Sequence, residues 1–262
     1  MNSLLTRFAP CISLIAATVL GAQDLPPRRA HHALEYDPVR KIVLMTGGST
    51  PIDGGRNFLF FNDVWAYDGR TWMSLPSSGN KLSGMRLAFD KKRGRMISWG
   101  GYDGADASGE LRNLDANTWT TLGSYRDQRV AEAGFVYDSR RDRFVWFGGG
   151  GGGGPTRGET WIYRGDKWSR LDIPGPSARE AHAMVYDEKR DRVVVFGGMH
   201  SDGPGRPPTM LGDTWEFDGD KWTRIDAPGP SASASAGATY DSKRGRVILF
   251  GGAAQGGFTN AT

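Results

Sequence analysis

The chain has a single cysteine among its 262 residues. That residue, Cys11, lies in an apolar N-terminal segment, so the rest of the chain has neither a thiol nor a disulfide. Histidine is also scarce, and the only four are His31, His32, His182 and His200. Their spacing is not typical of a zinc or copper site, which needs a close set of His or Cys ligands. We therefore expect no thiol chemistry, no metal and no cofactor.

Long apolar runs are missing too, since a helix that crosses a bilayer needs about 20 apolar residues. The run Cys11–Leu20 is about half that length; it follows Arg7 and precedes the small residues Gly21 and Ala22. This order is typical of a signal peptide. We expect a signal peptide over residues 1–22, no transmembrane segment, and a secreted or extracytoplasmic protein.

A strong charge of one sign is absent as well. The net charge is only +4, from 33 basic and 29 acidic residues that are spread along the whole chain. Nucleic-acid binding usually depends on a clustered basic face. The seven glycines Gly148–Gly154 lack the Gly-Lys-Ser/Thr ending of a phosphate loop. We expect no nucleic-acid partner.

What the chain does contain is 38 glycines and a unit that recurs five times. Each copy has an aromatic residue, an aspartate, an arginine three residues later, an apolar run, and a Gly-Gly pair that ends eleven residues after the aspartate. The five aspartates are Asp37, Asp90, Asp138, Asp187 and Asp241. A period near fifty residues predicts a repeat fold. The arginines at the repeated position are expected to lie on solvated turns.

Each unit is predicted to form four short antiparallel strands. The aspartate and the residues after it form a tight hairpin turn between the first two strands. Two more strands come from pairs such as Asp213–Phe217 and Lys221–Ile225; the second unit keeps the fourth-strand tryptophan but has Arg112 in place of the third-strand one. All nine tryptophans fall on predicted strands, which indicates packing between sheets. Four strands per unit are typical of a propeller blade.

These features resemble the kelch family of β-propellers, in which four apolar residues precede Gly-Gly, the third strand has an aromatic residue and the fourth has a tryptophan. The resemblance extends from Arg29 to Thr262 and implies an all-β, kelch-type β-propeller with four complete four-stranded blades and an incomplete fifth. The blades are expected at residues 29–75, 82–122, 130–171, 179–225 and, in part, 233–262.

The fifth unit stops where a tryptophan is expected, because Asn260–Thr262 align with Gly212–Thr214. We expect a fragment of a six- or seven-bladed ring; the alternative is a five-bladed ring that closes imperfectly. An open last blade also allows self-association, because unpaired sheet edges pair with other chains.

The predicted topology places the long loops and the inter-blade linkers on one face, where binding residues concentrate. Its aromatic residues could stack on a sugar or peptide, or pack against a neighbouring blade. Its charged residues could bind hydroxyls or carboxylates, or form a solvated rim. The candidate ligand-binding residues on this face are Asp53, Arg56, Phe58, Phe60, Phe61, Tyr125, Arg126, Arg129, His200, Asp202 and Arg206.

Arg179 and His182 share repeat positions with Arg29 and His32. They resemble the Arg-x-x-His opening of some kelch repeats, which implies that they join the first strand to its neighbours. First strands also line the central channel of a propeller. Arg179 and His182 are therefore also candidate ligand-binding residues at the mouth of that channel.

The sequence favours a secreted, non-catalytic module that binds a protein or a glycan through its long-loop face. The alternative is a carbohydrate-active enzyme, of isomerase, lyase or hydrolase type, with a site near Arg179, His182 and His200; a third reading is a purely structural segment. The galactose-oxidase branch of the family needs a cysteine crosslinked to a tyrosine. No cysteine follows the predicted signal peptide, so copper radical chemistry is not expected.

Overall fold

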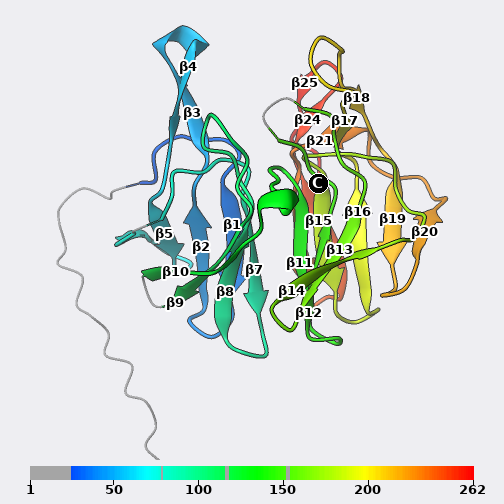
Figure 1. Cartoon of the computed structure of the whole chain (residues 1–262), viewed down its shortest axis with the longest axis horizontal. Helices are drawn as coiled ribbons and strands as arrows, with labels where there is room; N and C mark the ends of the chain where they lie inside the picture. Colours follow the sequence, from blue (N-terminus) through cyan, green and yellow to red (C-terminus); the bar gives the residue numbers. More distant parts are fainter. Residues whose placement is uncertain (1–24, 78, 116–117, 152–153) are drawn as a thin grey trace, which may run out of the picture.

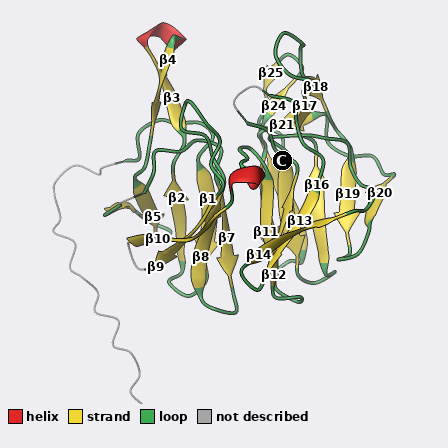
Figure 2. Cartoon of the chain, viewed as in Figure 1, coloured by secondary structure: helices red, strands yellow, loops and turns green. Residues whose placement is uncertain are grey.

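The computed structural model of the chain describes residues 25–77, 79–115, 118–151 and 154–262. The predicted signal peptide, residues 1–22, lies outside them. The protein is all-β, and Figure 2 shows strands and loops almost throughout. The helical segments in the described ranges are two short 3-10 turns, η1 (Asp53–Gly55) and η2 (Arg126–Gln128). No helix in this part is long and apolar enough to cross a membrane.

Four antiparallel sheets of four strands follow one another along the chain, and within each sheet the strands pair in chain order. The first sheet holds β1 (Ala33–Asp37), β2 (Ile42–Thr46), β5 (Val64–Tyr67) and β6 (Trp72–Leu75). The second holds β7 (Arg86–Asp90), β8 (Arg95–Trp99), β9 (Glu110–Asp115) and β10 (Thr118–Ser124). The third holds β11 (Gly134–Asp138), β12 (Arg143–Phe147), β13 (Thr160–Arg164) and β14 (Lys167–Leu171), and the fourth β15 (Ala183–Asp187), β16 (Arg192–Phe196), β19 (Thr214–Phe217) and β20 (Trp222–Ile225). The predicted four-stranded repeat unit is confirmed in these four copies.

The fifth repeat has two strands in the described chain, β22 (Gly237–Asp241) and β23 (Arg246–Phe250). Short strands form in loops and linkers: β3 (Ser49–Ile52), β4 (Asn57–Phe60), β17 (Met199–His200), β18 (Thr209–Met210), β21 (Ser233–Ala234), β24 (Ala253–Ala254) and β25 (Gly257–Phe258). In Figure 1 these short strands lie at the top, whereas the turns that join β7 to β8 and β11 to β12 lie at the bottom. The long loops therefore gather at one end of the sheets.

The first strands of the five repeats pack side by side in chain order, as β1, β7, β11, β15 and β22. A run of backbone hydrogen bonds joins the residues just before them. The carbonyl of His31 accepts from the Gly84 amide at 2.8 Å, and the same contact links Gly84 to Glu132, Glu132 to Ala181 and Ala181 to Ser235. All five residues have positive φ. We call these five residues the collar.

Apolar side chains of the second strands form the core between sheets, where Leu44, Ile97, Val145 and Val195 are fully buried. All nine tryptophans lie on strands, as predicted. The Gly-Gly pairs lie where two backbones approach each other closely. Gly198 has φ +95°, and a Cβ there would lie 2.7 Å from the Glu180 carbonyl oxygen. A larger residue at this position would be strained and would clash.

Arginines at the repeated hairpin position do more than face solvent. Arg141 is half-buried and the other four are exposed, but each pairs with the aspartate of its own turn, as Arg141 does with the buried Asp138. Arg141 also reaches the next repeat, where its two amino groups donate to Asp191 at 2.7 and 2.9 Å. Arg93 contacts Asp142 in the same way. The solvated-turn interpretation therefore missed a set of contacts between sheets.

Replacing Arg141 with alanine is expected to lower the free energy of unfolding by about 2 kcal/mol, because hydrogen bonds between charged groups contribute about 1.5–3 kcal/mol. Arg143 still pairs with Asp138 in this variant, which limits the loss. The matched control is Arg244→Ala at the same repeat position, since the Arg244 guanidinium pairs, among the described residues, with Asp241 of its own turn alone. Urea unfolding of both variants would check this prediction. Equal losses would show that the contact between repeats contributes nothing.

Candidate functional site

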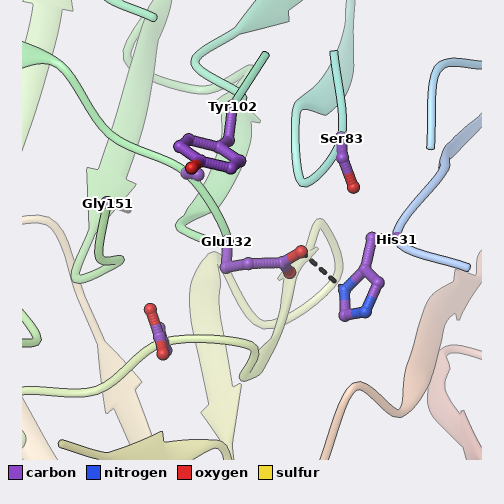
Figure 3. Close-up of a pocket in the computed structure, with 7 residues that line it drawn as sticks. His31, Ser83, Tyr102, Glu132 and Gly151 are labelled. Atoms are coloured by element: carbon purple, nitrogen blue, oxygen red, sulfur yellow. Dashed lines mark hydrogen bonds and ion pairs between the residues drawn. The ribbon is translucent and has the colours of Figure 1, made fainter. Parts of the chain in front are cut away.

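A cavity of about 300 Å³ lies beside the collar, at the long-loop end of the first strands. Its lining comes from collar residues, from the residues just before collar positions, and from loops that follow the Gly-Gly pairs. The lining residues are His31, Ser83, Tyr102, Ala131, Glu132, Gly151 and Glu180. We call this the collar cavity, and Figure 3 shows it in close-up. It draws together residues from the first four repeats.

Glu132 is the most tightly held side chain of the cavity. Its Oε1 lies 2.7 Å from Nδ1 of His31, and its Oε2 accepts from the Arg86 guanidinium at 2.9 Å. Figure 3 shows the carboxylate pointing at the His31 ring, with Ser83 and Tyr102 nearby. Because the three partners belong to the third, first and second repeats, this cluster fixes one ionised carboxylate where the repeats meet.

The pKa values of this cluster follow from burial and charge. Burial raises the pKa of Glu132, but the Arg86 guanidinium and the hydrogen bond from His31 outweigh it and lower that pKa to about 2. The hydrogen bond to Glu132 in turn raises the pKa of the His31 imidazole, against the effect of burial. In weakly acidic solution the cavity therefore contains an ionised Glu132 next to a protonated His31.

Glu180 is the second acid of the collar cavity. Burial raises its pKa, the nearby Glu132 charge raises it further, and His31 partly opposes this. Among the described residues no side-chain hydrogen bond or ion pair holds the Glu180 carboxyl group. Its polar atoms are thus available to a ligand, either as acceptors or, once protonated, as a donor.

Sequence reasoning did not identify this cluster, although a signal exists in the repeats. Collar residues lie six positions before the repeated aspartate, where other copies have Gly84, Ala181 and Ser235 in place of His31 and Glu132. Arg86 and Glu180 likewise replace residues that are Ala, Gly or Ser in the other copies. Charged side chains at positions that are otherwise small are the pattern that predicts the site.

Arg179 and His182 lie away from solvent. Arg179 is fully buried and donates to the Asp213 carboxylate at 2.7 and 2.9 Å and to the Gly197 carbonyl at 3.0 Å. His182 is only 4% exposed and meets the Phe147 ring edge-on at 5.4 Å. Burial lowers the pKa of His182 to about 3, so its ring is neutral. Neither residue lines the collar cavity, and this placement favours the structural alternative.

His200, Asp202 and Arg206 do come together, at the end of β17 and on the loop that follows it. The Nε2 of His200 lies 3.2 Å from the Asp202 carboxylate, which accepts from Arg206 at 3.1 Å. On its other side, Nδ1 of His200 lies 2.9 Å from the Ala178 carbonyl oxygen and 3.1 Å from the Thr156 hydroxyl. This chain of contacts orders the loop and does not reach the collar cavity lining.

The first long loop forms the β3–β4 hairpin, which projects from the sheets in Figure 1 and holds all of its candidates except Phe61, the residue directly after β4. Asp53, Arg56 and Phe58 are exposed there. Phe60 instead packs edge-on against Tyr102, with ring centroids 6.2 Å apart. Phe61 lies under the Arg29 guanidinium at 3.9 Å. The hairpin is thus joined to the collar cavity through Phe60 and Tyr102.

The linker candidates separate into packing and exposed residues. Tyr125 packs into an aromatic cluster with Trp99, Tyr163 and Trp168, at centroid distances of 6.1 to 6.4 Å. Arg126 is exposed on η2, and Arg129 lies 3.7 Å from Asp106 beside a second hollow of about 640 Å³. Over the described residues no group of three or more His, Cys, Asp and Glu side chains could hold a metal ion.

Comparison with protein-family models gave no match, and comparison with curated proteins found no similar sequence. The function must therefore be argued from the residues and geometry of the chain itself.

Proposed function

We propose that the chain is a secreted kelch-type β-propeller that binds a glycan, without catalysis, on its long-loop face. The propeller assignment is supported by the five Gly-Gly repeats, by the strand order of the four complete sheets, and by the side-by-side packing of the first strands. Secretion is supported by the apolar segment Cys11–Leu20 and the small residues after it.

The collar cavity is the observation that carries the choice of ligand. Its volume of about 300 Å³ is at the lower end of the range for small-molecule sites. Its polar groups are two carboxyls, an imidazole and a serine hydroxyl, and its lining also contains the aromatic ring of Tyr102. Hydroxyls donate to carboxylates and accept from imidazole, so this lining suits a ligand the size of one sugar ring.

Binding of a fluorescently labelled chain to an array of glycans would test this function. Glu180→Gln keeps the shape of the side chain but removes its charge and changes its acceptor pattern. We expect this substitution to weaken glycan binding by about tenfold or more, because a hydrogen bond to a charged group contributes about 1.5–3 kcal/mol. The matched control is Arg224→Gln on β20, an exposed side chain that does not line the collar cavity. Failure to bind any glycan, or equal binding by both variants, would contradict the proposal.

A second candidate function, a glycan-processing enzyme, is supported by the two acids of the cavity. Glu132 has a lowered pKa and Glu180 a raised one. Carboxyl groups whose pKa values are moved in opposite directions are typical of a general base and a general acid. Incubation of the array ligands with the chain, followed by product analysis, separates the two functions. Turnover of a glycan that Glu180→Gln abolishes would establish catalytic activity. Binding that leaves the glycan intact would support the non-catalytic binding function.

The His31–Glu132 pair should make the stability depend on pH. The raised pKa of His31 stabilises the folded state at pH values below 6.5, the ordinary pKa of histidine. This contribution is lost as the pH rises through the pKa that His31 has in the folded state. The lowered pKa of Glu132 stabilises the folded state at pH values above 4.5, the ordinary pKa of glutamate. This contribution is lost as the pH falls towards about 2. The pair is therefore most stabilising between pH 4.5 and pH 6.5.

Urea unfolding of the wild type and of His31→Gln checks this window. We expect the wild type to be more stable at about pH 5.5, and the difference to shrink at about pH 8.5. The difference should stay below ~1 kcal/mol, because His31 is half-exposed and solvent screens the pair. A difference that grows with pH would contradict the assignment of His31 as the protonated partner.

A further inference from the structure

The collar cavity contains two carboxyl groups, and the basic groups beside it serve only one of them. Nδ1 of His31 lies 2.7 Å from one oxygen of Glu132, and the Arg86 guanidinium donates to the other at 2.9 Å. In the part of the chain that the structure describes, no basic side chain is paired with Glu180. An ionised Glu180 therefore adds a negative charge that no neighbouring side chain balances.

The Glu180 carboxyl group lies in a place that residue 150 leaves open because it is glycine. A Cβ on Gly150 would overlap Oε2 of Glu180, and the three atoms nearest to such a Cβ all belong to this carboxyl group. The backbones on both sides are fixed, because Gly150 exchanges two hydrogen bonds with Ala131, and Glu180 exchanges two with Met199. The carboxyl group is thus positioned in the cavity before a ligand enters.

The charge of the cavity restricts the sugars that it can bind well. Burial raises the pKa of Glu180, and the negative charge of Glu132 raises it further. A positively charged ligand would offset both effects, because it favours the ionised carboxyl group. An acidic sugar would instead bring a third carboxylate close to two others, and like charges repel. A neutral sugar would leave the charge of Glu180 without a counter-charge.

We propose, on the basis of the glycan-binding function above, that the collar cavity selects a sugar with a free, protonated amino group, which forms an ion pair with Glu180. The ammonium group of such a sugar has three donors for carboxylate oxygens. Tyr102 also lines the cavity, and the face of its ring attracts a cation. Its hydroxyl donates to the Gly104 carbonyl at 2.7 Å, which fixes the ring. Acetylation of the amine removes the charge and should weaken binding.

The probes are the methyl glycosides of glucosamine, N-acetylglucosamine and glucose, together with the same three compounds of the galactose series. Within a series they differ only at carbon 2, which bears an amine, an acetamide or a hydroxyl group. Each is titrated into the full chain slightly below neutral pH, and binding is followed by the amide chemical shifts of the lining residues. In at least one series we expect the amine to bind about tenfold or more tightly than the other two, because a full charge interacts more strongly with a carboxylate than a dipole does.

Two substitutions test the role of Glu180 in this preference. Glu180→Gln should reduce the preference for the amine to less than about twofold, because the ion pair is lost. Gly150→Ala keeps both carboxyl groups but puts a methyl group where Oε2 of Glu180 lies, so it should also weaken binding of the amine. The matched control is Gly229→Ala, since a Cβ on Gly229 would meet no atom within 4 Å. Thermal unfolding confirms that each variant is folded.

The outcomes separate this inference from the function on which it rests. Equal affinity for the amine and hydroxyl forms, or a preference that Glu180→Gln retains, would overturn the amine selection but leave glycan binding intact. The same conclusion would follow if all six glycosides failed to bind while a glycan of the array did bind. Failure of every sugar to bind would overturn the proposed function itself, and the amine selection with it.

Discussion

Replacing Arg179 with alanine is expected to lower the free energy of unfolding by about 3–5 kcal/mol. The Arg179 guanidinium is fully buried and forms two hydrogen bonds to the Asp213 carboxylate. Burial raises the pKa of Asp213, but the hydrogen bonds from Arg179 and Trp215 lower it to about 2. Removal of the arginine would leave this partly buried charge and the Gly197 carbonyl without their partner. Breaking a buried pair in this way is among the most costly single changes.

Urea or thermal unfolding of Arg179→Ala measures the effect, with Arg224→Ala as an exposed control on β20. Glycan binding of the same variant, measured below its unfolding transition, distinguishes a structural role from a ligand-binding role. We expect binding to be retained while the chain is folded. Loss of glycan binding with unchanged stability would instead show that Arg179 belongs to the binding site.

Replacing Trp146 with alanine is expected to cost a further large amount, about 3–5 kcal/mol. Trp146 is fully buried, stacks on Trp161 at 5.5 Å, and lies 5.5 Å from both Trp99 and Trp168. Its indole N–H donates to the Gly148 carbonyl at 2.8 Å. Because Trp99 belongs to the second sheet and Trp146 to the third, the substitution would leave a cavity between two sheets.

The control for this prediction is Trp72→Ala. Trp72 lies part-exposed on β6 and has one aromatic partner, Tyr67, at 5.1 Å. We expect a clearly smaller loss, because less apolar surface leaves the core. Losses of equal size would show that packing between the second and third sheets contributes little to stability.

The repeat architecture could be predicted because local signals determine it. An aspartate that bonds the backbone of its own turn, followed by an apolar run and Gly-Gly, specifies a hairpin within about fifteen residues. The turn of the third repeat shows this contact, since Asp138 Oδ1 accepts from the Arg141 amide. Tryptophans on strands indicated packing between sheets for the same reason: alternating burial can be recognised within one strand.

The collar cavity could not be predicted in this way. His31 and Glu132 are 101 residues apart in sequence, and their contact depends on how three sheets pack side by side. The contact between Arg141 and Asp191 has the same origin, so a turn that looks solvated in one repeat is paired with the next. Conversely, Tyr125 looked like a loop residue, but it packs on Trp99 and Trp168 of two neighbouring sheets. The sequence of a single repeat does not determine its contacts with the other repeats.

The most direct test of this account is calorimetric titration of the glycan that binds best on the array. We predict saturable binding to the wild type at one site per chain, at least about tenfold weaker binding to Glu180→Gln, and unchanged binding to Arg224→Gln. Unchanged affinity for Glu180→Gln, in a chain with wild-type stability, would contradict the claim that the collar cavity is the binding site.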